Sequence, residues 1–193
     1  MEVHHLRDLV SCTSLALCSN GSLALLSGRR CFALLDLASP DSPVHREART
    51  SKWDVVCSEW SAQEDHLVAV ASNNKVELLT VTDREVVCTD VLRSHTRAIT
   101  DLAWHTHDRQ LLATSSADNY IYLWDRRDLR RPKAGLQAVQ GAARVEWNKV
   151  SPGVCVGSYS TVYNWICFIR LRSVYQTFWP FWVCFLSNRS VLF

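Results

Sequence analysis

His95, Ser116 and Asp118 are the three residue types of a serine hydrolase, and Trp124 follows them in the same stretch of sequence. In such an enzyme the serine attacks the substrate, the histidine takes its proton, and the carboxylate orients the histidine. The nucleophile of a hydrolase often lies in a G-x-S-x-G turn, with an oxyanion-binding loop nearby. Ser116 has no such glycines around it, and no oxyanion loop is evident. We therefore predict that the chain is not an enzyme.

The same residue types can instead satisfy one another inside a folded domain. A buried tryptophan has a single N–H group to donate. A serine hydroxyl can accept that hydrogen bond and donate its own to histidine, while an ionised aspartate accepts from histidine or from turn amides. We therefore predict a structural tetrad of His95, Ser116, Asp118 and Trp124. Thr114 lies two residues from Ser116, on the same strand face, and could take the same role.

Short strands must position these side chains. The segment YIYLWD (120–125) is rich in aromatic and β-branched residues, which favour strands. CFALLDL (31–37) and KVELLTV (75–81) occupy the same place in earlier parts of the chain. Apolar residues in these segments do not recur at helical spacing, so the sequence predicts an all-β fold.

An internal repeat of 43 or 44 residues organises the strands. It is marked by one anchor residue in each unit: Leu17, Trp60, Trp104 and Trp147. A period of about 40–45 residues is that of a four-stranded propeller blade. A single unit cannot bury both faces, so neighbouring units must stack. Closed propellers have about four to eight blades. This chain supplies about three and part of a fourth, which predicts an open arc with exposed strand edges.

The composition is that of a globular protein and argues against several functions. Of 193 residues, 48% are hydrophobic, and the formal net charge of +2 is too small to indicate a nucleic-acid partner. The eight cysteines are scattered without a C-x-x-C pair, so we predict no metal site. No pattern indicates a cofactor or a small-molecule substrate. Glu2 and Asp8 interrupt the first residues, which therefore do not match a secretory signal.

The third unit resembles a WD repeat, a family in which these four roles form a buried hydrogen-bonded chain inside a blade. Several segments resemble, more specifically, the N-terminal propeller of a WD-repeat subunit of the GATOR complex. They are LSGRR (26–30), SKWD (51–54), AVASNN (69–74), HTRAITDLAW (95–104), TSSADNYIYLWD (114–125) and ARVEWNK (143–149). SKWD, followed by the strand that ends in SNN, makes the resemblance more specific than a generic WD repeat.

This resemblance implies a partial WD40-type β-propeller that acts as a non-catalytic scaffold. The family's role is to promote signalling by the target of rapamycin kinase in response to amino acids. The resemblance implies other GATOR subunits as protein partners. It also implies a cytoplasmic location at the lysosomal membrane surface, with only indirect membrane association. Two alternatives stay open, namely a WD-repeat scaffold of another pathway and a truncated isoform without function.

The repeat predicts one partial propeller over residues 12–158. Its expected blades cover about 12–50, 51–92, 93–137 and 138–158. Residues 159–193 leave the repeat pattern, because they hold most of the aromatic residues of the chain and no Asp or Glu. We expect them to be a divergent segment from alternative splicing or a gene-model error. The alternatives are a membrane segment, which Arg170 and Arg172 interrupt, and a folded final blade.

A basic segment at residues 125–133 is the remaining candidate for contact with a partner. It contains Arg126, Arg127, Arg130 and Arg131. Clustered cations can bind an acidic protein surface. Asp125 and Asp128 lie in the same segment, however, and favour the alternative of a solvated connector.

Overall fold

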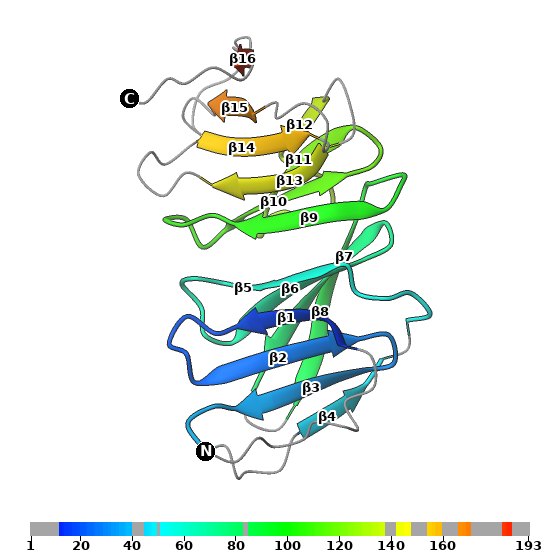
Figure 1. Cartoon of the computed structure of the whole chain (residues 1–193), viewed down its shortest axis with the longest axis vertical. Coiled ribbons are helices and arrows are strands. Elements are labelled where there is room, and N and C mark those ends of the chain that lie inside the picture. Colours follow the sequence, from blue (N-terminus) through cyan, green and yellow to red (C-terminus); the bar gives the residue numbers. More distant parts are fainter. Residues whose placement is uncertain are drawn as a thin grey trace.

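The computed structural model describes residues 12–39, 45–49, 51–82, 85–137, 142–147, 154–159, 166–170 and 183–186. In this part of the chain every regular element is a strand, and the strands form four-stranded antiparallel sheets that follow one another along the sequence (Figure 1). The prediction of an all-β fold, with stacked blades in an open arc, is confirmed.

Each sheet is a meander in which strands consecutive in sequence pair with one another. The first sheet contains β1 (Cys12–Leu17), β2 (Leu23–Gly28), β3 (Cys31–Asp36) and β4 (His45–Ala48). The second contains β5 (Cys57–Trp60), β6 (Leu67–Ser72), β7 (Lys75–Val81) and β8 (Val86–Arg93). The third contains β9 (Ile99–Trp104), β10 (Leu111–Ser116), β11 (Tyr120–Asp125) and β12 (Ala134–Gln137). The fourth contains β13 (Ala142–Trp147), β14 (Val154–Tyr159), β15 (Ile166–Arg170) and β16 (Val183–Leu186).

Tight turns with asparagine join the second and third strands of two sheets. Asn73 lies between β6 and β7 with φ 53°, and Asn119 lies between β10 and β11 with φ 68°. Asparagine tolerates this left-handed conformation better than most residues. The turns therefore place the ends of β6 and β10 beside the starts of β7 and β11.

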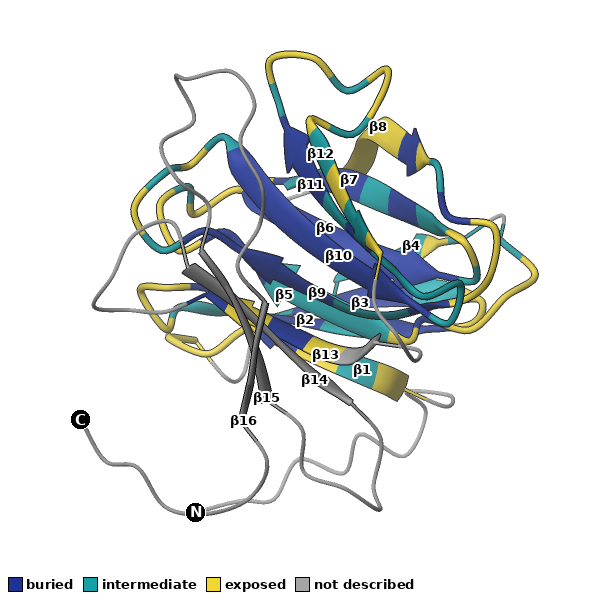
Figure 2. Ribbon diagram, turned by 90° about the horizontal axis from the view of Figure 1, so that it is seen from above, coloured by how far each residue is buried: buried dark blue, intermediate teal, exposed yellow. Residues whose placement is uncertain are grey.

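The second strands of the second and third sheets lie in the core. All six residues of β6 and all six of β10 are buried, and both strands are dark blue in Figure 2. Such a strand must be apolar or hydrogen-bonded on both faces, because a sheet covers each face. In β6, Val68 and Val70 pack toward the first sheet, while Leu67, Ala69 and Ala71 pack toward the third.

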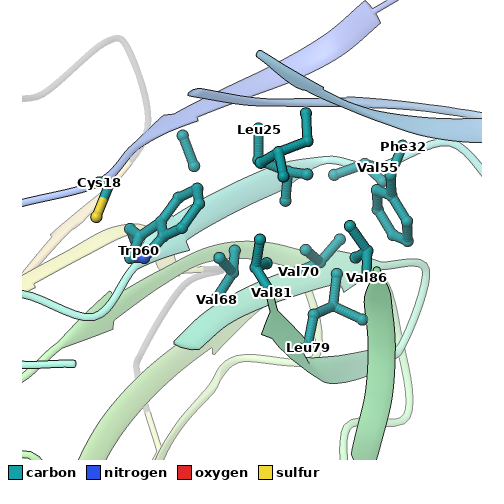
Figure 3. Close-up of a cluster of buried hydrophobic side chains, with 12 residues drawn as sticks. Cys18, Leu25, Phe32, Val55, Trp60, Val68, Val70, Leu79, Val81 and Val86 are labelled. Atoms are coloured by element: carbon teal, nitrogen blue, oxygen red, sulfur yellow. The ribbon is translucent and has the colours of Figure 1, made fainter. Parts of the chain in front are cut away.

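Among the described residues, three apolar clusters hold consecutive sheets together. The first joins the first two sheets and includes Leu25, Trp60 and Leu79 (Figure 3). The second lies between the second and third sheets and includes Leu78 and Trp124. The third joins the third sheet to Val145 and Trp147 of the fourth. Burial of these faces against one another supplies the stacking that the repeat requires.

The fourth sheet extends farther along the chain than expected. β15 and β16 lie in residues 159–193, which the repeat pattern placed outside the blades. β15 pairs with β14 and places Phe168 opposite Val156, and β16 pairs with β15. At these residues the backbone follows the alternative of a final blade. The physical reason is that the free edge of β14 has unpaired N–H and C=O groups that a further strand satisfies.

The remaining residues of that segment, 160–165, 171–182 and 187–193, lie outside the described residues. Within the described part of the chain, no helix combines the length and the apolar character needed to span a membrane.

Candidate functional site

A chain of hydrogen bonds crosses the third sheet from its core to a turn. The indole Nε1 of Trp124 donates to Oγ1 of Thr114 at 3.0 Å. That hydroxyl lies 2.9 Å from Nε2 of His95, and Nδ1 of His95 lies 3.0 Å from Oδ2 of Asp118. Trp124 is in β11, Thr114 is in β10, Asp118 is in the turn between them, and His95 precedes β9. Adjacent strands and one turn thus bring together residues far apart in sequence.

The protonation states in this chain follow from the partners. A carboxylate only accepts hydrogen bonds, so Nδ1 of His95 must carry a proton and donate to Asp118. Burial lowers the pKa of His95 although Asp118 opposes that shift, and this favours the neutral ring. Nε2 of a neutral ring then accepts from Thr114, whose oxygen accepts from Trp124. Every polar atom along the chain has a partner, as a buried network requires.

Asp118 fixes the turn as well as the histidine. Its Oδ2 also accepts from the backbone N–H of Thr96 at 2.9 Å, and its Oδ1 accepts from that of Tyr120 at 2.9 Å. Burial acts to raise the pKa of Asp118, but these two N–H groups and His95 outweigh it and hold the pKa below its ordinary value. The carboxylate is therefore ionised. It joins the turn after β10 to the residues that precede β9 and to the start of β11.

Ser116 does not belong to this chain, which corrects the expected tetrad. Its hydroxyl donates toward the carbonyl oxygens of Arg97 and Ala98 at 3.1 and 2.9 Å, and it accepts from the N–H of Asp118 at 3.2 Å. The physical reason is a shift in the pairing of β9 and β10 between Ser115 and Ser116. The shift carries the Ser116 hydroxyl to the backbone before β9, and Thr114 takes the place between Trp124 and His95.

The arrangement does not supply the geometry of a serine hydrolase. Ser116 has 0% of its surface exposed, and Nε2 of His95 contacts Thr114 instead of Ser116. A nucleophile needs a base within hydrogen-bond reach and access to a substrate. The described hydrogen bonds of Ser116 instead join the turn after β10 to the backbone that precedes β9.

The tryptophan anchors join one sheet to the next. Nε1 of Trp104 donates to the carbonyl oxygen of Glu59 in the second sheet at 3.1 Å. Nε1 of Trp147 donates in the same way to Ala103 in the third sheet at 2.9 Å. Glu59 and Ala103 each immediately precede an anchor, so the two contacts repeat from blade to blade. We call them the indole joints.

The other two anchors depart from this pattern. Trp60 is buried, but its Nε1 donates to the carbonyl oxygen of Asp65, in the loop between β5 and β6, at 2.9 Å. Leu17 ends β1 as Trp60 ends β5, but it is 56% exposed. Leucine has no N–H group in its side chain, and in the described residues no earlier sheet packs against this side of β1.

Carboxylates add further contacts next to the indole joints. Oε2 of Glu59 accepts from the backbone N–H of Trp104 at 2.8 Å, and Oδ2 of Asp101 accepts from that of Val145 at 3.1 Å. Desolvation raises the pKa of Glu59 to about 7. Burial also raises the pKa of Asp101. Sequence reasoning missed both residues, although each is an isolated acid in an otherwise strand-like segment that precedes an anchor tryptophan.

The basic segment is largely engaged within the chain. Nη1 of Arg126 pairs with Oε1 of Glu64, in the loop between β5 and β6, at 2.7 Å. Arg127 makes a two-bond pair with Asp125 at 2.8 and 2.6 Å. Arg130 is highly exposed and lies 3.8 Å from Asp128. The structure thus places Arg126, Arg127 and Arg130 beside carboxylates, in keeping with a connector, and Arg131 is exposed.

His105 caps a turn. Its Nδ1 accepts from the backbone N–H groups of His107 and Asp108 at 3.0 and 2.8 Å, and its ring lies 4.4 Å from that of Trp147. In the part of the chain that the structure describes, no three His, Cys, Asp or Glu side chains gather as metal ligands would.

The comparisons with known proteins agree with this architecture. The family model "WD domain, G-beta repeat" matches residues 86–125, which span β8 to β11. The human GATOR2 complex protein WDR59 is 40% identical over 131 residues, which is 67% of this chain and 13% of the human protein. This chain is a WDR59-like WD-repeat chain. It spans only a small part of the relatives that it matches.

This chain is also similar to two further relatives. The Drosophila melanogaster GATOR2 complex protein Wdr59 is 31% identical over 151 residues, 76% of this chain and 16% of the fly protein. Mouse diphthine methyltransferase is 29% identical over 134 residues, 68% of this chain and 26% of the mouse protein. Relatives with different names thus share sequence similarity with this chain.

Proposed function

We propose that the chain is a non-catalytic interaction module of a GATOR complex, which promotes signalling by the target of rapamycin kinase in response to amino acids. The observation that carries this proposal is the similarity to GATOR2 complex proteins over two thirds of the chain. The buried polar residues support the non-catalytic part, because Thr114, Ser116 and His95 have internal partners. The partners would be other GATOR subunits, and the location would be the cytoplasm at the lysosomal surface.

The physical mechanism is the display of loops on a rigid frame. The hydrogen-bonded chain in the third sheet and the indole joints fix strands relative to one another. Loops at the strand ends can then present side chains in constant positions to a partner.

Affinity purification tests this proposal. The tagged chain is expressed beside a version that ends at Ser158 and so lacks β15 and β16, and the bound proteins are identified by mass spectrometry. Recovery of GATOR2 subunits with the whole chain supports the proposal. Recovery of an unrelated WD-repeat assembly refutes it and favours the alternative of a scaffold in another pathway. Recovery of chaperones alone also refutes it for this chain.

A further inference from the structure

A pocket of about 360 Å³ lies where the connector between the first two sheets meets the β6–β7 turn and the end of β8. Its lining includes Lys52 and Trp53 from the connector, Asn74 from the turn and Arg93 from β8. Lys52 and Trp53 come from the SKWD segment and Asn74 from the SNN segment, and the side chains of the tetrad and the indole joints come from neither. The pocket is thus a feature of the chain that the architecture leaves unexplained.

The connector that forms one wall is held in place by its backbone. Nε of Arg29 donates to the carbonyl oxygen of Lys52 at 3.1 Å, and Nη1 of Arg49 donates to that of Trp53 at 3.3 Å. Both contacts leave the side chains of Lys52 and Trp53 on the surface. Trp53 is 48% exposed, and the ammonium group of Lys52 lies 5.6 Å from the centre of its ring.

The β6–β7 turn forms a second, polar wall. Asn73 holds the left-handed conformation of the turn, and Nδ2 of Asn74 donates to the carbonyl oxygen of His95 at 3.2 Å. His95 is also a member of the hydrogen-bonded chain of the third sheet. The pocket wall is therefore held by a residue with several hydrogen bonds, and a wall that is already ordered lowers the conformational cost of binding.

The charge of the lining has one sign. Lys52, Lys75 and Arg93 contribute cations, and the lining contains no carboxylate. Nearby acids are occupied, because Glu77 pairs with Lys75 and Arg49, and Asp54 pairs with Arg29. In the described residues, Lys52 and Arg93 have no carboxylate partner, so they can meet the charge of a ligand.

We propose that this pocket binds an acidic peptide segment of a protein partner, with the carboxylates of the segment against Lys52 and Arg93 and an apolar side chain against Trp53. Amide groups of Asn73 and Asn74 can hydrogen-bond the peptide backbone. An exposed indole beside unpaired cations is typical of a binding surface, since aromatic and arginine side chains carry much of the energy at interfaces. This inference rests on the proposed interaction function and names the surface that serves it.

The test is a selection from a random peptide display library with the whole 193-residue chain as bait. A parallel selection uses the charge-reversed variant Lys52→Glu/Arg93→Glu. The matched control, Arg130→Glu/Arg131→Glu, makes the same charge change on exposed residues elsewhere. Peptides that need the pocket should be rich in Asp and Glu around an apolar residue. We expect their affinity to fall about tenfold or more in the charge-reversed variant and to weaken as salt rises, but to persist in the control.

Trp53→Ala should weaken the same peptides about threefold to tenfold without changing the thermal unfolding midpoint, because the ring is on the surface. Selected peptides that are neutral or basic would overturn the inference. So would equal binding by the charge-reversed variant, competition by a single-stranded oligonucleotide, or no enrichment at all.

The two proposals can fail separately. If the charge-reversed variant still recovers GATOR2 subunits while the library yields no acidic peptide, the pocket assignment falls and the proposed function stands. If acidic peptides bind through Lys52 and Arg93 but no GATOR2 subunit is recovered, the pocket assignment stands and the proposed function falls.

Discussion

Replacing Thr114 by valine removes one hydroxyl group. This loss should lower the stability more than the loss of any other single hydroxyl group in the third sheet. Valine keeps nearly the same shape, so the change isolates the hydrogen bonds from packing. In the structure the Thr114 hydroxyl contacts both Trp124 and His95, and Thr114 is fully buried.

The magnitude follows from the two partners that lose a contact. Nε1 of Trp124 becomes a buried donor without an acceptor, and Nε2 of His95 becomes a buried acceptor without a donor. Each such group costs about 1–3 kcal/mol, so Thr114→Val should lower the free energy of unfolding by about 2–6 kcal/mol. Thr114→Ser keeps the hydroxyl and loses one methyl group, which should cost about 1 kcal/mol. Ser116→Ala loses the turn contacts and should cost about 1–2 kcal/mol.

Urea unfolding followed by tryptophan fluorescence gives the three values on the same scale, provided that the dependence on urea concentration is equal among variants. The decisive comparison is between Thr114→Val and Ser116→Ala. If Ser116→Ala is the more damaging, or if Thr114→Val changes stability by less than about 0.5 kcal/mol, the assignment of Thr114 as the central link is wrong.

Three further predictions rest on other contacts. Trp124→Ala should destabilise by about 3–5 kcal/mol as a buried aromatic does, and an unchanged melting temperature would contradict this. Glu59 has a folded pKa of about 7, above its ordinary value of 4.5. Because the folded state holds this proton more tightly than the unfolded state, the contribution of Glu59 to the free energy of unfolding is fully present below pH 4.5. It is lost as the pH rises through 7. Glu59→Gln should consequently be more stable than the wild type at pH 8 by about 1–3 kcal/mol, and the difference should vanish near pH 4 in denaturant titrations at both values. Arg126→Ala should cost about 1–2 kcal/mol, and a double-mutant cycle with Glu64→Gln should show coupling; additive effects would mean that the ion pair between the sheets is not formed.

The sequence was sufficient to predict three members of the hydrogen-bonded chain. His95, Asp118 and Trp124 differ in chemistry from the apolar residues around them, and their spacing matches strand, turn and strand. The choice between Thr114 and Ser116 could not be made in the same way. Both have a hydroxyl and lie on one strand face, and only the shift in pairing at the end of β10 distinguishes them.

Other differences arise from contacts between sheets. The period correctly aligned Leu17 with Trp60 and Trp104, but burial depends on a neighbour, and none covers Leu17 in the described residues. β15 and β16 lack the repeat pattern, so nothing in their spacing indicated that they would pair with β14. The period of the sequence repeat predicts which residues of different units occupy the same position. It does not predict which segment of the chain will pair with the open edge of a sheet.

The acceptors of the indole joints have a consequence for how such a chain can diverge. Trp104 and Trp147 bond to backbone carbonyl oxygens, which every amino acid possesses. An indole joint therefore requires a tryptophan in the following blade, but it requires no particular side chain in the preceding blade. The second sheet illustrates this, because Leu79 occupies the place that Trp124 has in the third, yet Trp104 still docks on the second sheet. Mutations can erase the polar chain of a blade while its attachment survives, so substitutions can accumulate unevenly along one arc without breaking it apart.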